Sequence, residues 1–199
     1  MIVTVTSHKG GVGKTVTSIH LAAFFEKKFG EGSTVLIDTD PNASALEWSE
    51  RGRLPFPVVG PEGDPGDEEH VILDSQGRLG GDDLEAAAED SDLLVVPTTP
   101  EALSLNALML LVEELEALRG NAEYRVLLTM VPWWNRSGAN ARKALEAEDV
   151  PLLKGEIRRR EAFQTAALRG VPVYEVNERR AQQGWEDYEK VGRQVVKFR

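Results

Sequence analysis

The stretch "SHKGGVGKTVTS", residues 7–18, lies between an apolar run at residues 1–6 and a pattern typical of an amphipathic helix. A strand, a glycine-rich turn and a helix in that order direct several backbone N–H groups and the positive end of the helix dipole toward one point, which suits a di- or triphosphate. The usual phosphate-loop pattern, G-x-x-x-x-G-K-[ST], is incomplete, because His8 stands in place of the first glycine. A second lysine, Lys9, follows it directly.

This loop supplies the first candidate site residues. We predict that the Lys14 ammonium reaches the β- and γ-phosphates of a nucleotide and that the Thr15 hydroxyl binds Mg²⁺. The alternative is a tight glycine turn with an incidental Gly-Lys-Thr, which the flanking strand and helix patterns disfavour. The predicted nucleotide-binding residues are Lys9, Gly10, Gly11, Val12, Gly13, Lys14, Thr15 and Val16.

Length and composition limit the class of protein. The 199 residues are enough for one α/β domain, so residues 1–199 are expected to form a single domain. The absence of cysteine excludes disulfides and thiolate metal sites and favours a cytoplasmic location. A net charge of −10 argues against a uniformly basic nucleic-acid binder but leaves room for a local basic patch. Neither a signal peptide nor a membrane span is expected.

Apolar runs alternate with helical patterns along the chain. The predicted buried strands are residues 2–6, 34–38, 71–74, 93–97 and 125–130. The predicted helices cover residues 14–29, 101–119, 137–148 and 185–198, with a further helix around residues 44–51, and Gly120 is expected to end the helix at 101–119. This alternation indicates an α/β fold, a doubly wound, mainly parallel sheet with helices on both faces.

Two carboxylates, Asp38 and Asp40, stand at the end of a predicted strand in "VLIDTDPNASALEW", residues 35–48. Ligands of parallel sheets bind at the carboxyl ends of the strands. One carboxylate can hold a magnesium-bound water while the other orients a water that attacks the γ-phosphate. The alternative is that Asp40 or Asn42 caps the helix that follows.

A third stretch, "HVILDSQG", residues 70–77, ends an apolar strand in Asp74 and places Gly77 soon after it. This is the form of a Walker B segment, in which the carboxylate lies near Mg²⁺ and the glycine-bearing turn senses the γ-phosphate. The alternative is an aspartate that faces solvent at the end of a strand.

The motifs "KGGVGKT", "IDTDPNAS" and "VILDSQG", followed by "SDLLVVPTTPEALSL", resemble the ParA/MinD family of deviant-Walker ATPases. Within it, the match is best to small ParA-type DNA-partition ATPases, and "EIRRREAFQTAALRGVPVYEV", residues 156–176, extends the resemblance over nearly the whole chain. The resemblance implies a P-loop NTPase fold of the deviant Walker A type, with ATP and Mg²⁺ as cofactors.

The resemblance also implies residue roles. Lys9 would be the signature lysine that reaches the nucleotide of a partner subunit, and Asp40 would activate the attacking water. A second ammonium near Lys14 is repelled unless more negative charge is present, and two nucleotides facing each other across a two-fold axis supply that charge. A lysine that merely faces solvent is the alternative. The predicted catalytic residues are Lys9, Lys14 and Asp40, and the predicted metal ligands are Thr15, Asp38 and Asp74.

The chain departs from the family at several positions. Val16 stands where a second threonine is common, Asn42 replaces a frequent glutamine, and "DSQG" replaces the usual Asp-Thr-Pro-Pro. The altered segment at residues 75–77 puts the hydrolysis rate in question. The chain starts at its first strand, so no N-terminal helix-turn-helix domain for operator binding is expected.

The densest basic run contains Arg158, Arg159 and Arg160. Clustered arginines are sufficient for nonspecific phosphate contacts with DNA, which the resemblance also implies. The alternatives are a solvated face with ion pairs to Glu156 and Glu161, or a place for Arg158 near the adenine. Other basic residues that would extend the run in space are Arg136, Arg142, Lys143, Arg169, Arg179 and Arg180.

The last predicted helix has one apolar face, formed by Trp185, Tyr188, Val191, Val195 and Phe198. Packing of this face onto the sheet is the expected interpretation, and a MinD-like helix lying on a membrane is the alternative. Trp133 and Trp134 either pack under a loop or wall the nucleotide or dimer interface, so they receive no role.

The sequence thus predicts an ATPase that binds ATP and Mg²⁺ as a sandwich homodimer, hydrolyses ATP slowly and binds DNA nonspecifically on the nucleoid. A ParB-like centromere-binding partner would stimulate hydrolysis, and the outcome would be segregation of a plasmid or chromosome. The alternatives are a MinD-like regulator on a membrane, an ATPase that positions a protein cluster or organelle, and a metabolic P-loop kinase. No acceptor-substrate lid is recognisable to support a kinase.

Overall fold

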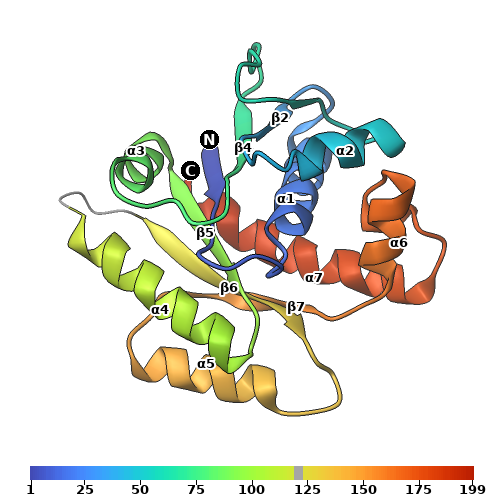
Figure 1. The fold of residues 1–199 in the computed structure, drawn as a ribbon. Coiled ribbons are helices and arrows are strands. Elements are labelled where there is room, and N and C mark those ends of the chain that lie inside the picture. Colours follow the sequence, from blue (N-terminus) through green and yellow to red (C-terminus); the bar gives the residue numbers. More distant parts are fainter. Residues whose placement is uncertain (119–122) are drawn as a thin grey trace.

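A seven-stranded, fully parallel sheet organises the computed structural model, which describes residues 1–118 and 123–199. The strand order is β3-β2-β4-β1-β5-β6-β7 (Figure 1). The strands are β1 (Ile2–Val5), β2 (Thr34–Asp38), β3 (Val58–Val59), β4 (His70–Asp74), β5 (Leu93–Thr98), β6 (Tyr124–Val131) and β7 (Leu152–Arg158). Because all pairs are parallel, the carboxyl ends of β1, β2 and β4 meet at one edge.

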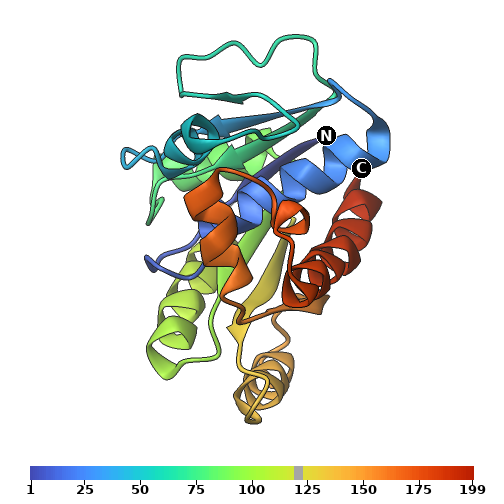
Figure 2. The same cartoon turned by 90° about the vertical axis from the view of Figure 1, so that its right-hand side faces the viewer.

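Helices cover both faces of the sheet, as the doubly wound prediction requires. They are α1 (Lys14–Phe29), α2 (Ser44–Arg51), α3 (Asp82–Asp90), α4 (Ala102–Ala117), α5 (Ser137–Ala147), α6 (Ala162–Arg169) and α7 (Arg179–Val195), with short 3₁₀ turns at Val173–Glu175 and Val196–Phe198. One hydrophobic cluster lies under α1, α2, α6 and α7, and a second lies under α3, α4 and α5. Figure 2, seen from the side of the first cluster, shows α1, α6 and α7 in front of the sheet.

All five predicted strands are present, and the helices at residues 14–29 and 44–51 have the predicted bounds. The predicted end of a helix at residues 119–120 lies outside the described residues. Sequence reasoning missed β3, β7, α3 and α6. The missed β7 is an edge strand with an alternating pattern of buried and exposed residues, so it lacks the continuous apolar run that marks the central strands. The missed α3 buries only Leu84, too little for a helical periodicity.

The apolar face of α7 packs into the core. Trp185, Tyr188, Val191 and Val195 are at most 2% exposed, and α7 lies against α1 and β7. The interpretation of this face as core packing is confirmed, and the face is therefore not available to a lipid surface. In the part of the chain that the structure describes, no helix combines the length and apolar character that crossing a bilayer requires.

Two glycines bring the C-terminal ends of α2 and α6 together. A Cβ built on Gly170 would lie 2.2 Å from the backbone nitrogen of Gly52 and 2.7 Å from the carbonyl oxygen of Trp48. Gly170 also has a φ of +66°, in the left-handed region that favours glycine. The neighbouring atoms are backbone and cannot rotate away, so this contact holds α2 at a fixed distance from α6.

We therefore expect Gly170→Ala to lower the free energy of unfolding by about 2 kcal/mol, because it combines backbone strain with overpacking. Urea denaturation measures the change. Gly80→Ala is the matched control, since a Cβ there meets no atom within 4 Å, and it should shift stability by less than about 0.5 kcal/mol. Equal losses in the two variants would contradict the close contact.

Candidate nucleotide site

The loop between β1 and α1 turns through two glycines with left-handed backbone. Gly11 and Gly13 have φ values of +76° and +88°, so a side chain at either position would strain the turn. The first main-chain bond of α1 joins the Thr17 amide to the Gly13 carbonyl at 2.9 Å, and no side chain caps the helix. The unpaired N–H groups of the first turn and the positive helix end are thereby left for an anion.

The loop is fixed from behind by β6. The Thr129 hydroxyl donates a 2.7 Å hydrogen bond to the Val12 carbonyl, and the Val12 side chain is buried. Val12 therefore anchors the loop, whereas the predicted residues Gly10, Gly11, Gly13, Lys14, Thr15 and Val16 line a cavity of about 700 Å³.

The same cavity has walls from five other segments. Asp40 and Asn42 line it from the loop after β2, and Gln76 and Gly77 line it from the loop after β4. Sequence reasoning missed the remaining wall, which includes Trp48 and Arg51 of α2, Met130 at the end of β6 and Ala167 of α6. Trp48 and Arg51 could have been found from the sequence, because they lie on one face of the predicted helix at residues 44–51.

Lys14 and Asp40 form an ion pair within this cavity. The Lys14 Nζ and the Asp40 Oδ2 are 3.3 Å apart, and both side chains are about one-tenth exposed. Burial raises the pKa of Asp40, but the backbone N–H of Asn42 and the charge of Lys14 outweigh it and leave the pKa below its ordinary value. Asp40 is thus ionised at neutral pH and lies beside the lysine predicted to bind phosphate.

Asp38 has a different hydrogen-bonding role. Its Oδ1 accepts the amide of Asp40 at 3.1 Å, and its Oδ2 accepts the amides of Ala45 and Leu46 at 2.8 and 3.1 Å. The carboxylate therefore holds the first turn of α2 and the preceding loop, the capping role that the alternative interpretation gave to Asp40 or Asn42. A metal-binding role for Asp38 stays a prediction.

Asp74 lies fully buried at the end of β4. Its Oδ1 accepts a 2.9 Å hydrogen bond from Ser18, whereas its Oδ2 has no hydrogen-bond partner among the described residues. Burial raises the pKa of Asp74 to about 6, against the opposing influence of Thr15, Lys14 and Ser18. A buried carboxylate with one unpartnered oxygen beside a threonine hydroxyl suits a hard cation.

The donor set fits Mg²⁺ better than a metal held by protein alone. No group of three or more His, Cys, Asp or Glu residues that could hold a metal occurs within residues 1–118 and 123–199. Mg²⁺ commonly binds one or two carboxylates and completes its coordination with phosphate oxygens and water. The single carboxylate of Asp74 next to the phosphate loop meets that requirement.

The second lysine of the loop points elsewhere. The Lys9 Nζ donates a 2.9 Å hydrogen bond to the Ser104 hydroxyl at the start of α4, and Lys9 does not line the phosphate-loop cavity. The preceding residue, His8, contacts Glu114 of α4 through its Nε2 at 3.0 Å. Lys14 therefore faces the phosphate-loop cavity, whereas Lys9 faces the start of α4.

An apolar cavity of about 210 Å³ adjoins the phosphate-loop cavity. The two share Gly13, Val16, Met130 and Ala167. Other walls of the apolar cavity are Ile157, Phe163 and Tyr188 together with the three arginines of the basic run. Arg158 is the last residue of β7, and Arg159 and Arg160 follow it.

The three arginines differ in their environment. Arg158 and Arg159 are exposed and form no ion pair among the described residues, including the ion pairs with Glu156 and Glu161 considered from the sequence. Arg160 is 11% exposed and pairs with Asp187 at 3.3 Å. Arg160 therefore contributes little free charge to this surface.

Comparisons with known proteins agree with this geometry. The family model of the CobQ/CobB/MinD/ParA nucleotide binding domain matches residues 3–173. The chain is 32% identical over 206 residues to the maintenance of carboxysome distribution protein A of Gloeobacter kilaueensis, which covers 98% of this chain and 93% of that protein.

Solved structures share the fold. A protein described as a plasmid partition protein of Borrelia burgdorferi B31, bound to AMPPNP, matches with a TM-score of 0.76 and 19% identity over 98% of each chain. The septum site-determining protein MinD of Pyrococcus horikoshii OT3, complexed with Mg-ADP, matches with a TM-score of 0.67 and 19% identity over 98% of this chain and 96% of that one.

The resemblance seen in the sequence motifs and the predicted P-loop fold are thus confirmed. The family model covers most of the chain, and the Gloeobacter relative covers nearly all of it. The loop and the cavity lie at the carboxyl ends of the strands, the edge at which parallel sheets bind ligands. The chain belongs to the CobQ/CobB/MinD/ParA family of nucleotide-binding domains and is a ParA/MinD-type P-loop ATPase.

Proposed function

We propose that this protein binds ATP with Mg²⁺, forms an ATP-dependent sandwich homodimer, binds DNA nonspecifically and hydrolyses ATP slowly to position a cargo on the nucleoid. The proposal rests on the different positions of the two lysines of the loop. Lys14 lines the phosphate-loop cavity, whereas the Lys9 ammonium lies outside it at the start of α4. A lysine that does not line the phosphate-loop cavity of its own chain can reach the cavity of a second copy of the chain.

Within one chain, the nucleotide would extend through the two adjoining cavities. The triphosphate faces the uncapped end of α1 and Lys14, and the adenine enters the apolar cavity between Met130, Phe163 and Tyr188. Thr15 and the free oxygen of Asp74 would hold Mg²⁺, which neutralises charge on the phosphates when it is bound. The ligands of the Borrelia and Pyrococcus proteins, AMPPNP and Mg-ADP, support this assignment.

Hydrolysis is assigned to Asp40. The carboxylate is ionised and lies 3.3 Å from the lysine that binds phosphate, so it can accept a proton from a water at the γ-phosphate. Asp38 positions this loop through its bond to the Asp40 amide. Gln76 and Gly77 line the same cavity and would respond to the γ-phosphate, which would link nucleotide state to the shape of the dimer surface.

The cargo has two candidates. The sequence motifs favour segregation of a plasmid or chromosome with a ParB-like partner. The Gloeobacter relative, similar over nearly its whole length, favours positioning of a protein body instead. The MinD-like membrane alternative loses its main support, because the apolar face of α7 is buried. Isolation of proteins that stimulate the ATPase distinguishes the two cargoes: a centromere-binding protein indicates partition, and an adaptor of a protein body indicates positioning.

Lys9→Ala tests the dimer. We expect the ATP-dependent dimer to be weakened about tenfold or more, because a charged contact with the partner's phosphates is lost, while ATP binding by the monomer persists. Light scattering with AMPPNP and Mg²⁺ measures the mass, and a labelled nucleotide measures binding. Lys154→Ala removes an exposed lysine from the distant edge strand and is the matched control. A normal dimer in the Lys9 variant would overturn its bridging role.

Asp40→Ala tests the assignment of the water-activating group. Turnover of ATP should fall about 100-fold or more, and the ATP-bound dimer should accumulate, because the general base is lost while phosphate binding remains. Phosphate release and light scattering give the two readouts. The control is Asp67→Ala, in the exposed loop between β3 and β4. Unchanged turnover would assign the base to another residue.

Asp74→Asn tests the metal carboxylate by a stability readout that does not depend on activity. Burial raises the pKa of Asp74 from 3.8 to about 6, so the folded parent binds more protons than the unfolded chain in this interval. Its free energy of unfolding therefore falls as the pH rises from about 4 to above 6, and Asp74→Asn lacks this fall.

At pH 7 without nucleotide, the Asp74→Asn variant should accordingly be more stable than the parent, although it should lose Mg²⁺-dependent turnover. Asp38→Asn is the contrasting variant. It should be less stable, because the two oxygens of Asp38 accept three backbone N–H groups and an amide offers only one oxygen. Chemical denaturation over a pH series measures both variants, and a destabilised Asp74→Asn would contradict the buried-charge argument.

A further inference from the structure

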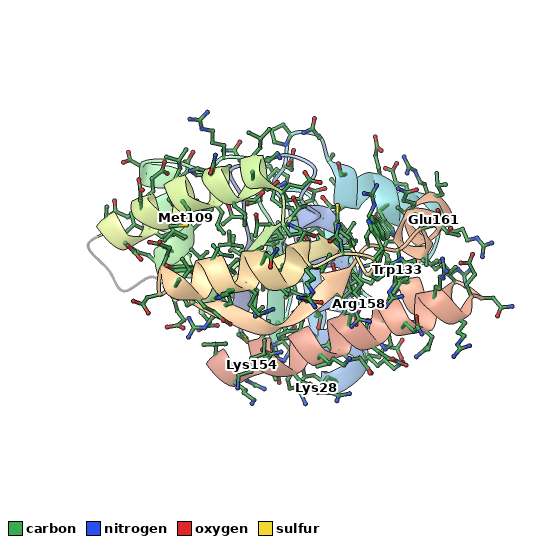
Figure 3. The ribbon with its side chains drawn as sticks, turned by 90° about the horizontal axis from the view of Figure 1, so that it is seen from below. Lys28, Met109, Trp133, Lys154, Arg158 and Glu161 are labelled. Carbon is green, nitrogen blue, oxygen red and sulfur yellow. The ribbon has the colours of Figure 1, made fainter. Side chains whose placement is uncertain are left out.

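A further cavity of about 470 Å³ adjoins the apolar cavity and contains no residue of the phosphate loop. Trp133 and Trp134, between β6 and α5, form part of its wall and are 71% and 57% exposed. Their ring centroids are 5.9 Å apart, and the ring planes are nearly perpendicular at 88°. Figure 3 shows Trp133 close to Arg158 and Glu161 in the view from below. Two large aromatic rings left in solvent indicate a contact surface.

The rest of the cavity carries positive charge. Arg158, Arg159 and Arg180 line it, all three are exposed, and none forms an ion pair within the described residues. Arg160 also lines it, but its charge is matched by Asp187. Glu161 is the acidic residue that the cavity contains, and Gln164 and Gln183 supply neutral polar groups. The surface therefore has an excess of cations around two aromatic rings.

Exposed aromatic rings next to free arginines match the chemistry of an unpaired nucleic-acid strand. Every base has a flat face that can stack on an indole, and the phosphates between bases pair with guanidinium groups. Double-stranded DNA presents phosphates but keeps its bases stacked inside, so it accounts for the arginines and not for the tryptophans. A membrane surface would favour protruding rings over rings that wall a hollow.

We infer that this aromatic–arginine cavity binds single-stranded nucleic acid, with unpaired bases stacked on Trp133 and Trp134 and phosphates held by Arg158, Arg159 and Arg180. The inference rests on the DNA-binding part of the proposed function and adds to it a preference for unpaired bases. It also gives a role to the two tryptophans, which the sequence left without one.

The cavity also lies next to the nucleotide site. Arg158, Arg159, Arg160 and Gln164 line both this cavity and the apolar cavity assigned to the adenine. A nucleotide that orders these side chains changes the surface offered to the strand. By linkage, the strand changes the affinity for the nucleotide by the same factor.

Tryptophan fluorescence of the full chain provides a direct test. The chain has four tryptophans, and the other two, Trp48 and Trp185, are only 4% and 2% exposed. Quenching on addition of a short oligodeoxythymidylate strand therefore reports on Trp133 and Trp134. The titration is made with and without AMPPNP and Mg²⁺, and it is repeated with an abasic strand of equal length and with a duplex.

Variants without these tryptophans are compared with the parent by the anisotropy of a fluorescein-labelled strand. The Trp133→Leu/Trp134→Leu variant should bind the thymidylate strand about tenfold or more weakly, because stacking on the two rings is lost. Its affinity for the abasic strand and the duplex should stay within about twofold, since phosphate contacts remain. Trp133→Phe/Trp134→Phe should restore most of the strand affinity, because phenylalanine rings still stack. Emission from the buried Trp48 and Trp185 reports whether each variant is folded.

Arg180→Ala should weaken binding of all three nucleic acids and reduce its dependence on salt. Arg193→Ala, which removes an exposed arginine of α7 that does not line the cavity, is the matched control and should have no effect. Equal strand affinity in the parent and the leucine variant would overturn the inference. So would equal losses of affinity for the strand, the abasic strand and the duplex in the leucine variant, or quenching of the parent by anionic vesicles and not by the strand.

Two further outcomes separate this inference from the proposed function. If the parent binds the duplex but shows no quenching and no affinity with the thymidylate strand, the inference fails and the proposed DNA binding stands. If the parent binds neither nucleic acid while the ATP-dependent dimer still forms, both the inference and the DNA-binding part of the proposed function fail.

Discussion

The uncapped amino end of α1 is the constraint on which the site depends. No side chain satisfies its first N–H groups, and the turn before it uses left-handed backbone at Gly11 and Gly13. A fold can keep such an end open only where the surrounding structure holds it, and the bond from Thr129 to the Val12 carbonyl does so from behind. The cavity, the apolar pocket beside it and the carboxylates are arranged around this fixed point.

Three carboxylates of similar sequence context acquire different properties from their surroundings. Asp38 is held by three backbone amides, Asp40 is kept ionised beside Lys14, and burial raises the pKa of Asp74. These environments suit three different roles, which are positioning a loop, accepting a proton and holding a cation. An unpaired buried charge at Asp74 lowers the stability of the protein. A metal ion and a phosphate bound at this site would compensate the charge.

Much of the fold and of the loop was predictable, because their signals are local. A glycine-rich turn between a strand and a helix specifies backbone geometry in a few residues, and the continuous apolar runs mark buried parallel strands. The edge strand β7 and the short helix α6 were missed, because half of β7 faces solvent and α6 has only two turns. Arg158 ends β7, Arg159 and Arg160 lie between β7 and α6, and both elements line the apolar cavity, so most of the wall of this cavity was also missed.

By itself, the sequence determined the parallel α/β fold, the phosphate loop and the identity of the lysines and aspartates that surround it. Only the tertiary structure decided which partner each of them meets. Lys9 donates a hydrogen bond to Ser104, which belongs to a helix distant in the sequence. Asp38 rather than Asp40 holds the first turn of α2. Trp133 and Trp134 share a cavity with Arg180. The physical reason is that a local pattern specifies backbone direction, whereas charge pairing and burial depend on residues brought together across the sheet.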